Sequence, residues 1–415
     1  MGKVLLYSLL LLLGLIGSQI LPADAHGVRE AIALCTMAAL AFIMIHVGFE
    51  FEIDRERPRQ YVLDAGVAFS AAAVPWLLCA VYFVFAMKPR ELWFYTDAWK
   101  SSLLQGLFAA PTSAGVLFSM LAAAGLSATW LFKKARILAI FDDLGTILLM
   151  IPMKILLTGM HWQLAVIMVI LIALLAAAWF LLRKLPAPHS WPWVLGYAIG
   201  ITLLCEGIYW ASRWFDPSMP VQVEVLLPAF ALGCVVHKSG HHDSPADARA
   251  STIVSAIFMV LVGLSMPSIV SGGSAGSGHE MLKYAGASAE SLAAKNAFPG
   301  WGVIGLHVFM ITLISNVGKL IPALCYRNEA TFKQRLALAV GMFPRGEVGA
   351  GVLVIALSYG IAGPALTVAV LSLAVNLMAT GVFIMIVKKL LASDAADPAQ
   401  SSHGVFQPAR GETAG

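Results

Sequence analysis

The chain has 415 residues, of which 59% are hydrophobic and only 12% are charged, against about 25% charged in ordinary soluble domains. So few polar residues could not cover the wet surface of a soluble fold, and the continuous apolar runs lack the alternation of a transmembrane β-barrel. The net charge of +4 is too small to indicate a nucleic-acid partner.

Apolar runs of about 18–25 residues recur along almost the whole chain, and each is long enough to cross a hydrocarbon core of about 30 Å. They predict an all-α polytopic membrane protein with about twelve transmembrane helices. The expected helices cover residues 3–21, 29–53, 62–86, 99–124, 132–157, 161–184, 191–213, 221–238, 250–271, 299–326, 334–360 and 363–391. We expect residues 1–391 to form one transmembrane domain. Residues 392–415, rich in Ala, Ser, Pro and Gly, are expected to form a short disordered tail, and the loop 272–298 has a similar composition.

The first apolar run allows two interpretations. Lys3, the apolar stretch and Ala23-Asp24-Ala25 resemble a secretory signal with its cleavage site. The stretch is long for a signal peptide, which favours a retained transmembrane helix.

Lysine and arginine in the connecting segments predict the orientation. With the N-terminus inside, the cytoplasmic connections carry most of these residues, among them Arg55, Lys133, Lys134 and Lys333. We therefore expect a multi-pass protein of the cell inner membrane with both termini in the cytoplasm. The five cysteines, Cys35, Cys79, Cys205, Cys234 and Cys325, all lie in apolar runs without CxxC spacing, which is typical of small core residues.

The chain contains a weak internal repeat. The segment 43–50 aligns with 258–265, and 106–117 aligns with 341–353 when one residue is inserted. The partners lie seven expected helices apart, so they cross the membrane in opposite directions. This arrangement indicates an inverted-topology repeat, from which many secondary transporters are built.

Five charged residues cluster inside three of the expected helices, and a charged group costs about 2.5–3.5 kcal/mol at the bilayer centre. They are Asp142, Asp143, Lys319, Arg345 and Glu347. Buried charges of this kind mark ion pathways. Three acids and two bases leave a formal charge of −1, which suits a site occupied in turn by a cation and by protons.

The two aspartates are adjacent, so their side chains point about 100° apart on a helix and can serve different faces. Two close carboxylates resist double ionisation, and a proton held there can be displaced by a cation. Asn316 lies three residues before Lys319, near the same helix face, and could join the network.

Two expected helices contain breakers in corresponding places. Pro111 interrupts the fourth helix, and Pro344, with Gly346 close by, interrupts the eleventh. Broken helices at mid-membrane expose carbonyl and amide groups that can coordinate ions. The hydroxyl groups of Thr112 and Ser113 add oxygen ligands suitable for a hard cation such as sodium.

At these residues the chain resembles the sodium/proton exchanger family of the monovalent cation:proton antiporter superfamily. The matching motifs are Val47-Gly48-Phe49-Glu50-Phe51, Ala110-Pro111-Thr112, Phe141-Asp142-Asp143, Gly318-Lys319 and Pro344-Arg345-Gly346-Glu347-Val348-Gly349. Their order and spacing agree across roughly residues 29–391. Together the Asp-Asp pair and the Pro-Arg-Gly-Glu stretch are fairly specific.

The resemblance implies a homodimer with a dimerisation domain and a core domain, in which helices four and eleven unwind and cross. It implies that Asp143 binds the cation or a proton, with Thr112 lining the site. It further implies that Asp142 pairs with Lys319 when no cation is bound, and that Arg345 and Glu347 stabilise the crossing. Exchange would be electrogenic, by alternating access, between a monovalent cation and protons.

The sequence departs from the family at one position of the site, because Ala110 stands where many relatives have Asp. Affinity and ion choice are the properties that this change affects. The tail is too short for the nucleotide-binding domain of potassium-efflux relatives, and we expect no cofactor.

Two other functions fit the sequence less well. A channel or uniporter on the same scaffold lacks a repeated carbonyl filter sequence. An intramembrane protease would need two aspartates on separate segments, and Leu144-Gly145 after the pair lacks the further acids of a magnesium–diphosphate enzyme. A transporter, not an enzyme, is therefore expected, with sodium as the favoured cation and lithium and potassium as alternatives.

Overall fold

The computed structural model describes residues 2–20, 26–49, 58–158, 162–181, 187–215, 221, 223, 225–236, 245–265, 300–358, 361 and 363–395. Within these ranges every regular element is a helix. The first half contains α1 (Gly2–Ile20), α2 (His26–Phe49), α3 (Pro58–Met87), η1 (Arg90–Leu92), α4 (Thr96–Gly106), η2 (Leu107–Ala109), α5 (Ala114–Ala123), α6 (Trp130–Thr158) and α7 (Trp162–Phe180). The second half contains α8 (Trp191–Phe215), α9 (Leu226–Val235), α10 (Pro245–Leu264), α14 (Trp301–Gly318), α15 (Ile321–Leu324), α16 (Phe332–Gly341), α17 (Glu347–Ser358), α18 (Pro364–Met378) and α19 (Thr380–Ala395).

The all-helical prediction is confirmed, and each expected helix coincides with one to three of these elements. Helix α19 runs to Ala395, beyond the expected boundary at 391. The expected loop at 272–298 and residues 396–415 of the expected tail lie outside the described residues.

Six helices of the described part are long and apolar enough to cross a membrane: α2, α3, α4–α5, α8, α10 and α14–α15. The pair α18–α19, bent by 47°, would make a seventh. Helix α6 is long enough to cross a membrane but is not among these six, because charged residues, including Asp142 and Asp143, interrupt its apolar sequence. Twelve membrane crossings therefore remain a prediction.

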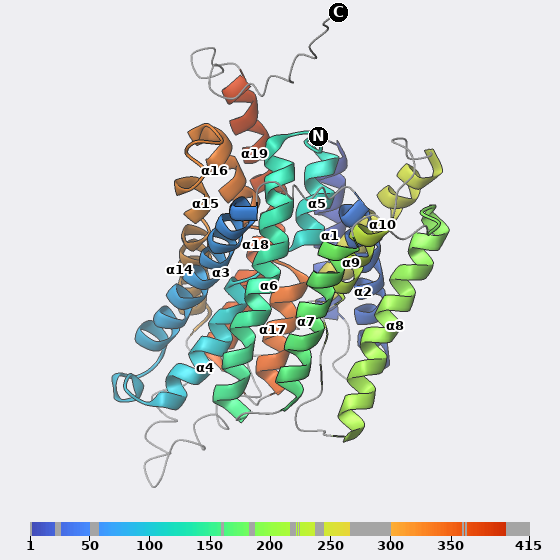
Figure 1. Ribbon diagram of the computed structural model, residues 1–415. Helices are drawn as coiled ribbons and strands as arrows, with labels where there is room; N and C mark the ends of the chain where they lie inside the picture. The colour runs from blue at the N-terminus through green and yellow to red at the C-terminus, as the bar shows by residue number, and fades with distance from the viewer. Residues whose placement is uncertain are drawn as a thin grey trace, which may run out of the picture.

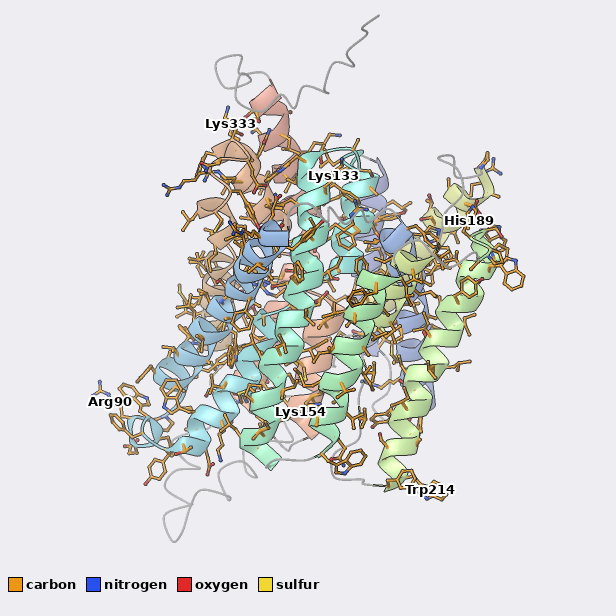
Figure 2. All side chains as sticks on the ribbon, viewed as in Figure 1. Arg90, Lys133, Lys154, His189, Trp214 and Lys333 are labelled. Atoms are coloured by element: carbon orange, nitrogen blue, oxygen red, sulfur yellow. The ribbon has the colours of Figure 1, made fainter. Side chains whose placement is uncertain are left out.

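The helices form an elongated bundle in which α1 begins and α19 ends at the same end (Figure 1). We call this the terminal end. Lys133, Lys333 and His189 lie toward the terminal end, whereas Arg90, Lys154 and Trp214 lie toward the opposite end (Figure 2). The expected topology places Lys133 and Lys333 at one end and Arg90 at the other, as observed, and the cytoplasmic location of the terminal end stays a prediction.

Two close helix crossings at glycine residues occur at equivalent positions of the inverted repeat. Gly48 of α2 packs against Gly233 of α9, where a methyl group on Gly48 would lie 2.6 Å from the Phe230 carbonyl oxygen. Gly263 of α10 packs in the same way against Gly14 of α1. Small residues let helix backbones approach closely in membranes. Gly48 and Gly263 are the residues that the sequence repeat aligns, so each half contributes an equivalent crossing.

The two broken helices meet at the centre of the bundle. Between α5 and the preceding η2, and between α16 and α17, the chain leaves helical geometry for several residues. Pro111 and Pro344 lie in these breaks, since proline has no N–H group and its ring clashes with the preceding turn. The backbone N–H of Ser113 donates to the Pro344 carbonyl (2.9 Å), which fixes one break against the other.

Further hydrogen bonds across the crossing are reciprocal. The Thr112 hydroxyl donates to the Met342 carbonyl (3.1 Å), and Arg345 Nε donates to the Ala109 carbonyl (3.3 Å). Each break therefore supplies one side-chain donor and one backbone acceptor to the other.

Candidate functional site

Lys319 lies at a helix end that directs its side chain to the crossing. Helix α14 ends at Gly318, and Lys319 has non-helical torsion angles (φ −79°, ψ 0°) as its C-cap residue. Its backbone N–H donates a hydrogen bond of 3.1 Å to the Asn316 carbonyl, which closes a tight turn. The side chain is fully buried, with 0% of its surface exposed.

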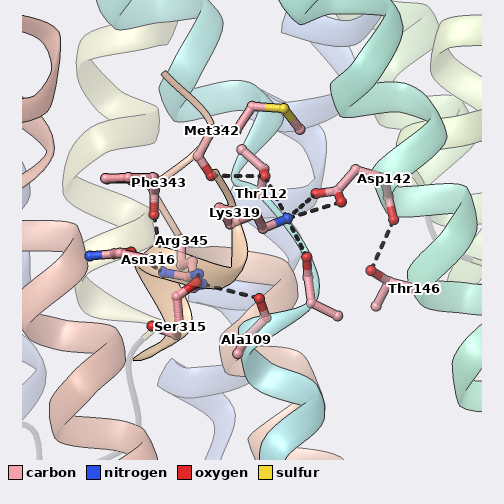
Figure 3. A network of polar contacts seen from close by, with 11 residues as sticks. Ala109, Thr112, Asp142, Thr146, Ser315, Asn316, Lys319, Met342, Phe343 and Arg345 are labelled. Atoms are coloured by element: carbon pink, nitrogen blue, oxygen red, sulfur yellow. Dashed lines mark hydrogen bonds and ion pairs between the residues drawn. The ribbon is translucent and has the colours of Figure 1, made fainter. Parts of the chain in front are cut away.

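The Lys319 ammonium group is enclosed by oxygen atoms (Figure 3). It donates to both carboxylate oxygens of Asp142, at 2.7 and 2.9 Å, and to the Thr112 hydroxyl at 3.1 Å. The carbonyl oxygen of Ala110, freed by the helix break, is a further acceptor. Asp142 is also 0% exposed, so this is an ion pair inside the bundle. Breaking such a pair by removing one partner is strongly destabilising.

This oxygen set has the chemistry of a cation site. Carboxylate, hydroxyl and carbonyl oxygens are the ligands of hard cations. The Lys319 ammonium stands where a small monovalent cation would find the same four oxygens. The arrangement can therefore hold one positive charge, either the ammonium or an ion that replaces it.

Asp143 occupies the neighbouring position on the uninterrupted helix α6. It is 2% exposed, and its side chain points about 100° away from that of Asp142. The Thr146 hydroxyl donates to the Asp142 carbonyl at 2.9 Å, within the same helix. Ser113, 1% exposed, lies in the facing break. Two buried carboxyl groups are therefore present on α6, and one of them contacts Lys319.

Arg345 is the second buried cation and is also 0% exposed. Its guanidinium group donates to the Asn316 side-chain oxygen (2.8 Å) and to the carbonyls of Ser315 (2.9 Å) and Phe343 (3.3 Å). Ser315 lies in the last turn of α14, whose carbonyl groups have no partner within the helix and carry the negative end of its dipole. Arg345 therefore holds the end of α14 against both broken helices.

The break before α5 supplies carbonyl groups to both cations. Ala109 accepts from Arg345 and Ala110 accepts from Lys319. The break before α5 therefore orients two charged side chains. One is Lys319, at the end of α14, and the other is Arg345, in the break between α16 and α17.

The structure brings together seven of the eight predicted site residues: Asp142, Asp143, Thr112, Ser113, Lys319, Arg345 and Asn316. Glu347 begins α17 at the crossing, and its side chain lies outside the described part. The sequence did not predict that the backbone carbonyls of Ala109, Ala110, Met342 and Ser315 accept hydrogen bonds at the site, because every residue has a backbone carbonyl.

Comparisons with known proteins support the architecture. No family model matches the sequence, and no curated protein matches it in sequence. Among solved structures, the chain is similar to the sodium proton antiporter MjNhaP1 from Methanocaldococcus jannaschii at pH 8. The TM-score is 0.54 and the identity 14%, and the match covers 92% of each chain. This similarity shows that the chain has the same fold.

Proposed function

We propose that this protein is a secondary antiporter that exchanges a monovalent cation, sodium in the first instance, for protons. The observation that carries the proposal is the buried Asp142–Lys319 pair, held at the crossing of two broken helices. The fold shared with a structure described as a sodium proton antiporter supports it.

In the proposed cycle the Lys319 ammonium is the internal competitor of the cation. A cation that enters the site takes over the oxygens of Asp142 and Thr112, with Asp143 and Ser113 as additional ligands. Lys319 then moves off, and one positive charge has replaced another at Asp142. The oxygens are already in place around the ammonium, so little reorganisation is needed.

Protons use Asp143 and Lys319. When the cation binds, Asp143 releases one proton and the displaced Lys319 ammonium releases a second; when the cation leaves, both groups take up a proton again and Lys319 returns to Asp142. Two protons are then exchanged for one monovalent cation, so transport is electrogenic. Arg345, Asn316 and Glu347 hold the crossing and do not bind the cation.

Alternating access fits the way in which the helices group. Helices α1, α2, α8, α9 and α10 contact one another, and α3, α4, α6, α14 and α18 form a second group around the crossing. We propose that the second group moves against the first, that the first group forms a homodimer, and that the protein works in the cell inner membrane with both termini in the cytoplasm.

The test uses proteoliposomes that contain a pH-sensitive dye and carry an imposed proton gradient. Sodium, lithium or potassium is added outside to the wild type, to Asp143→Asn and to the control Asp97→Asn. Asp97 is an exposed acid that pairs with Lys100 at the opposite end of the bundle. We expect one cation to collapse the gradient in the wild type and in the control, but not in Asp143→Asn.

A membrane potential applied with potassium and valinomycin tests electrogenicity, since it should change the rate of sodium-driven proton movement. Cation flux that moves no protons would identify a channel or uniporter. No response to any of the three cations, in vesicles that hold a gradient and contain folded protein, would refute the antiporter proposal.

A further inference from the structure

A second group of buried charges lies at the terminal end, away from the crossing. Asp64 of α3 is 1% exposed and Lys134 of α6 is 4% exposed. The Lys134 ammonium contacts the two Asp64 oxygens at 2.9 and 3.2 Å and a Glu329 oxygen at 2.9 Å. The Tyr326 hydroxyl donates to Asp64 at 2.8 Å, and Lys134 Nζ lies 4.3 Å from the centre of the Tyr326 ring. We call these four residues the Asp64 cluster.

Tyr326 is held tightly in this cluster. Its φ of +47° is the only left-handed value of a non-glycine residue in the described part of the chain, and it disfavours a bulky side chain. Burial, with the Asp64 carboxylate beside it, raises the pKa of the Tyr326 hydroxyl above its usual range. The hydroxyl therefore stays protonated and donates to Asp64 at every physiological pH.

A buried ion pair is weak evidence for stability, because desolvation offsets the attraction between the charges. Buried pairs are better attested as devices that fix one arrangement of helices over others. The Asp64 cluster joins three segments: α3, α6 and the connection between α15 and α16, which contains Tyr326 and Glu329. It is positioned to fix how these segments lie relative to one another.

Those segments carry the charges of the crossing. Lys134 and Asp142 lie on the same continuous helix, about 12 Å apart along its axis at 1.5 Å per residue. The connection that holds Tyr326 follows α15, which begins two residues after Lys319. Fixing Tyr326 to α3 and α6 thus fixes the segment that bears Lys319 relative to the helix that bears Asp142.

The other side of the same connection is held as well. Thr331 caps α16, and its hydroxyl donates to Asp394 at 2.7 Å, while the Gln334 amide donates to the second Asp394 oxygen at 2.8 Å. Arg335 Nη1 donates to the carbonyls of Ala323 and Cys325, each at 3.1 Å. Because these contacts hold α16 and the end of α15, the position of α15 relative to α3 and α6 depends on the Asp64 cluster.

We propose that Asp64, Lys134 and Tyr326 are positioning residues, which hold Lys319 against Asp142 from outside the ion site. The proposal rests on the proposed antiport function, in which Lys319 competes with the cation for Asp142. Weakening the Asp64 cluster weakens the competitor and leaves the oxygens of the site in place. A cation then binds more tightly.

The first measurement is a thermal-shift titration of the purified full-length protein with sodium, lithium and potassium chloride. The variants are Tyr326→Phe, which removes the hydroxyl and keeps the ring, and the control Tyr95→Phe at an exposed position of the opposite end. We expect Tyr326→Phe to lower the apparent Kd of the cation by about three- to tenfold. Tyr95→Phe should leave it unchanged.

A double-mutant cycle separates positioning from general weakening of the fold. In a Lys319→Gln background the competitor is gone, so adding Tyr326→Phe should leave the apparent Kd unchanged. A shift of the same size in both backgrounds, or none in either, would overturn the proposal. Glu329→Gln, which leaves the Asp64–Lys134 pair in place, serves as the milder variant if Tyr326→Phe folds poorly.

Hydrogen exchange measured by mass spectrometry supplies a readout that does not depend on cation binding. Tyr326→Phe should raise exchange in the peptide 319–324, next to the crossing, as well as in 325–331. If none of the three cations shifts the melting temperature of the wild type, the proposed antiport function is refuted. The hydrogen-exchange measurement then still tests the positioning role of the Asp64 cluster. A rise confined to 325–331 would show that the Asp64 cluster holds only its own loop.

Discussion

The Asp142–Lys319 pair makes the sharpest stability prediction. Lys319→Met keeps most of the length of the side chain and removes its charge, which leaves the Asp142 carboxylate at 0% exposure without its cation. Removing one partner of a buried pair costs about 3–5 kcal/mol. For a chain of this length that corresponds to a fall in Tm of about 3–6 °C. The Tm of Asp142→Asn should fall by a similar amount, because the Lys319 ammonium is then buried without a carboxylate.

The double variant Lys319→Met/Asp142→Asn should melt above either single variant, since it buries no charge at this position. Residues in direct contact show coupling energies of about 0.5–3 kcal/mol, and complete burial places this pair toward the upper end. The assay is thermal unfolding in detergent, followed by tryptophan fluorescence, with Asp97→Asn/Lys100→Met as an exposed ion pair for comparison. If the double variant melts at or below the less stable single variant, the pair is not coupled as its geometry requires.

Three further predictions concern other contacts. Gly48→Leu should overpack the α2–α9 crossing and lower stability by about 1–3 kcal/mol in a thermal melt, whereas Gly200→Leu, where nothing lies within 4 Å of an added methyl group, should have little effect. Thr112→Val should lose both hydrogen bonds of its hydroxyl and lower stability by about 1–3 kcal/mol, and Thr112→Ser should retain both stability and cation-driven proton flux. The pKa of Tyr326 is raised in the folded state, so its hydroxyl contributes fully below about pH 10, where an unfolded tyrosine begins to ionise, and loses that contribution above it. The stability deficit of Tyr326→Phe in denaturant titrations should therefore be constant from about pH 6 to 9 and shrink above about pH 10; a deficit that grows with alkaline pH would contradict this.

The sequence by itself determined the class of the protein and most residues of the candidate site. Hydropathy depends only on the local run of residues, so the helices were predicted close to their observed ranges. Proline likewise acts locally, so Pro111 and Pro344 marked both breaks. Charged residues in apolar runs needed no structure to be noticed, and Asp142, Lys319 and Arg345 do meet at the crossing.

Only the tertiary structure decided which groups touch. Lys319 and Asp142 are 177 residues apart, and Arg345 and Ala109 are 236 apart. Such contacts depend on how distant segments pack, which residue identity alone does not encode. The backbone carbonyl ligands could not be predicted for the same reason. Asp64 and Lys134 lie near the ends of their helices, where charged residues are common, and the α15–α16 connection, which contains Tyr326 and Glu329, covers them as a buried pair.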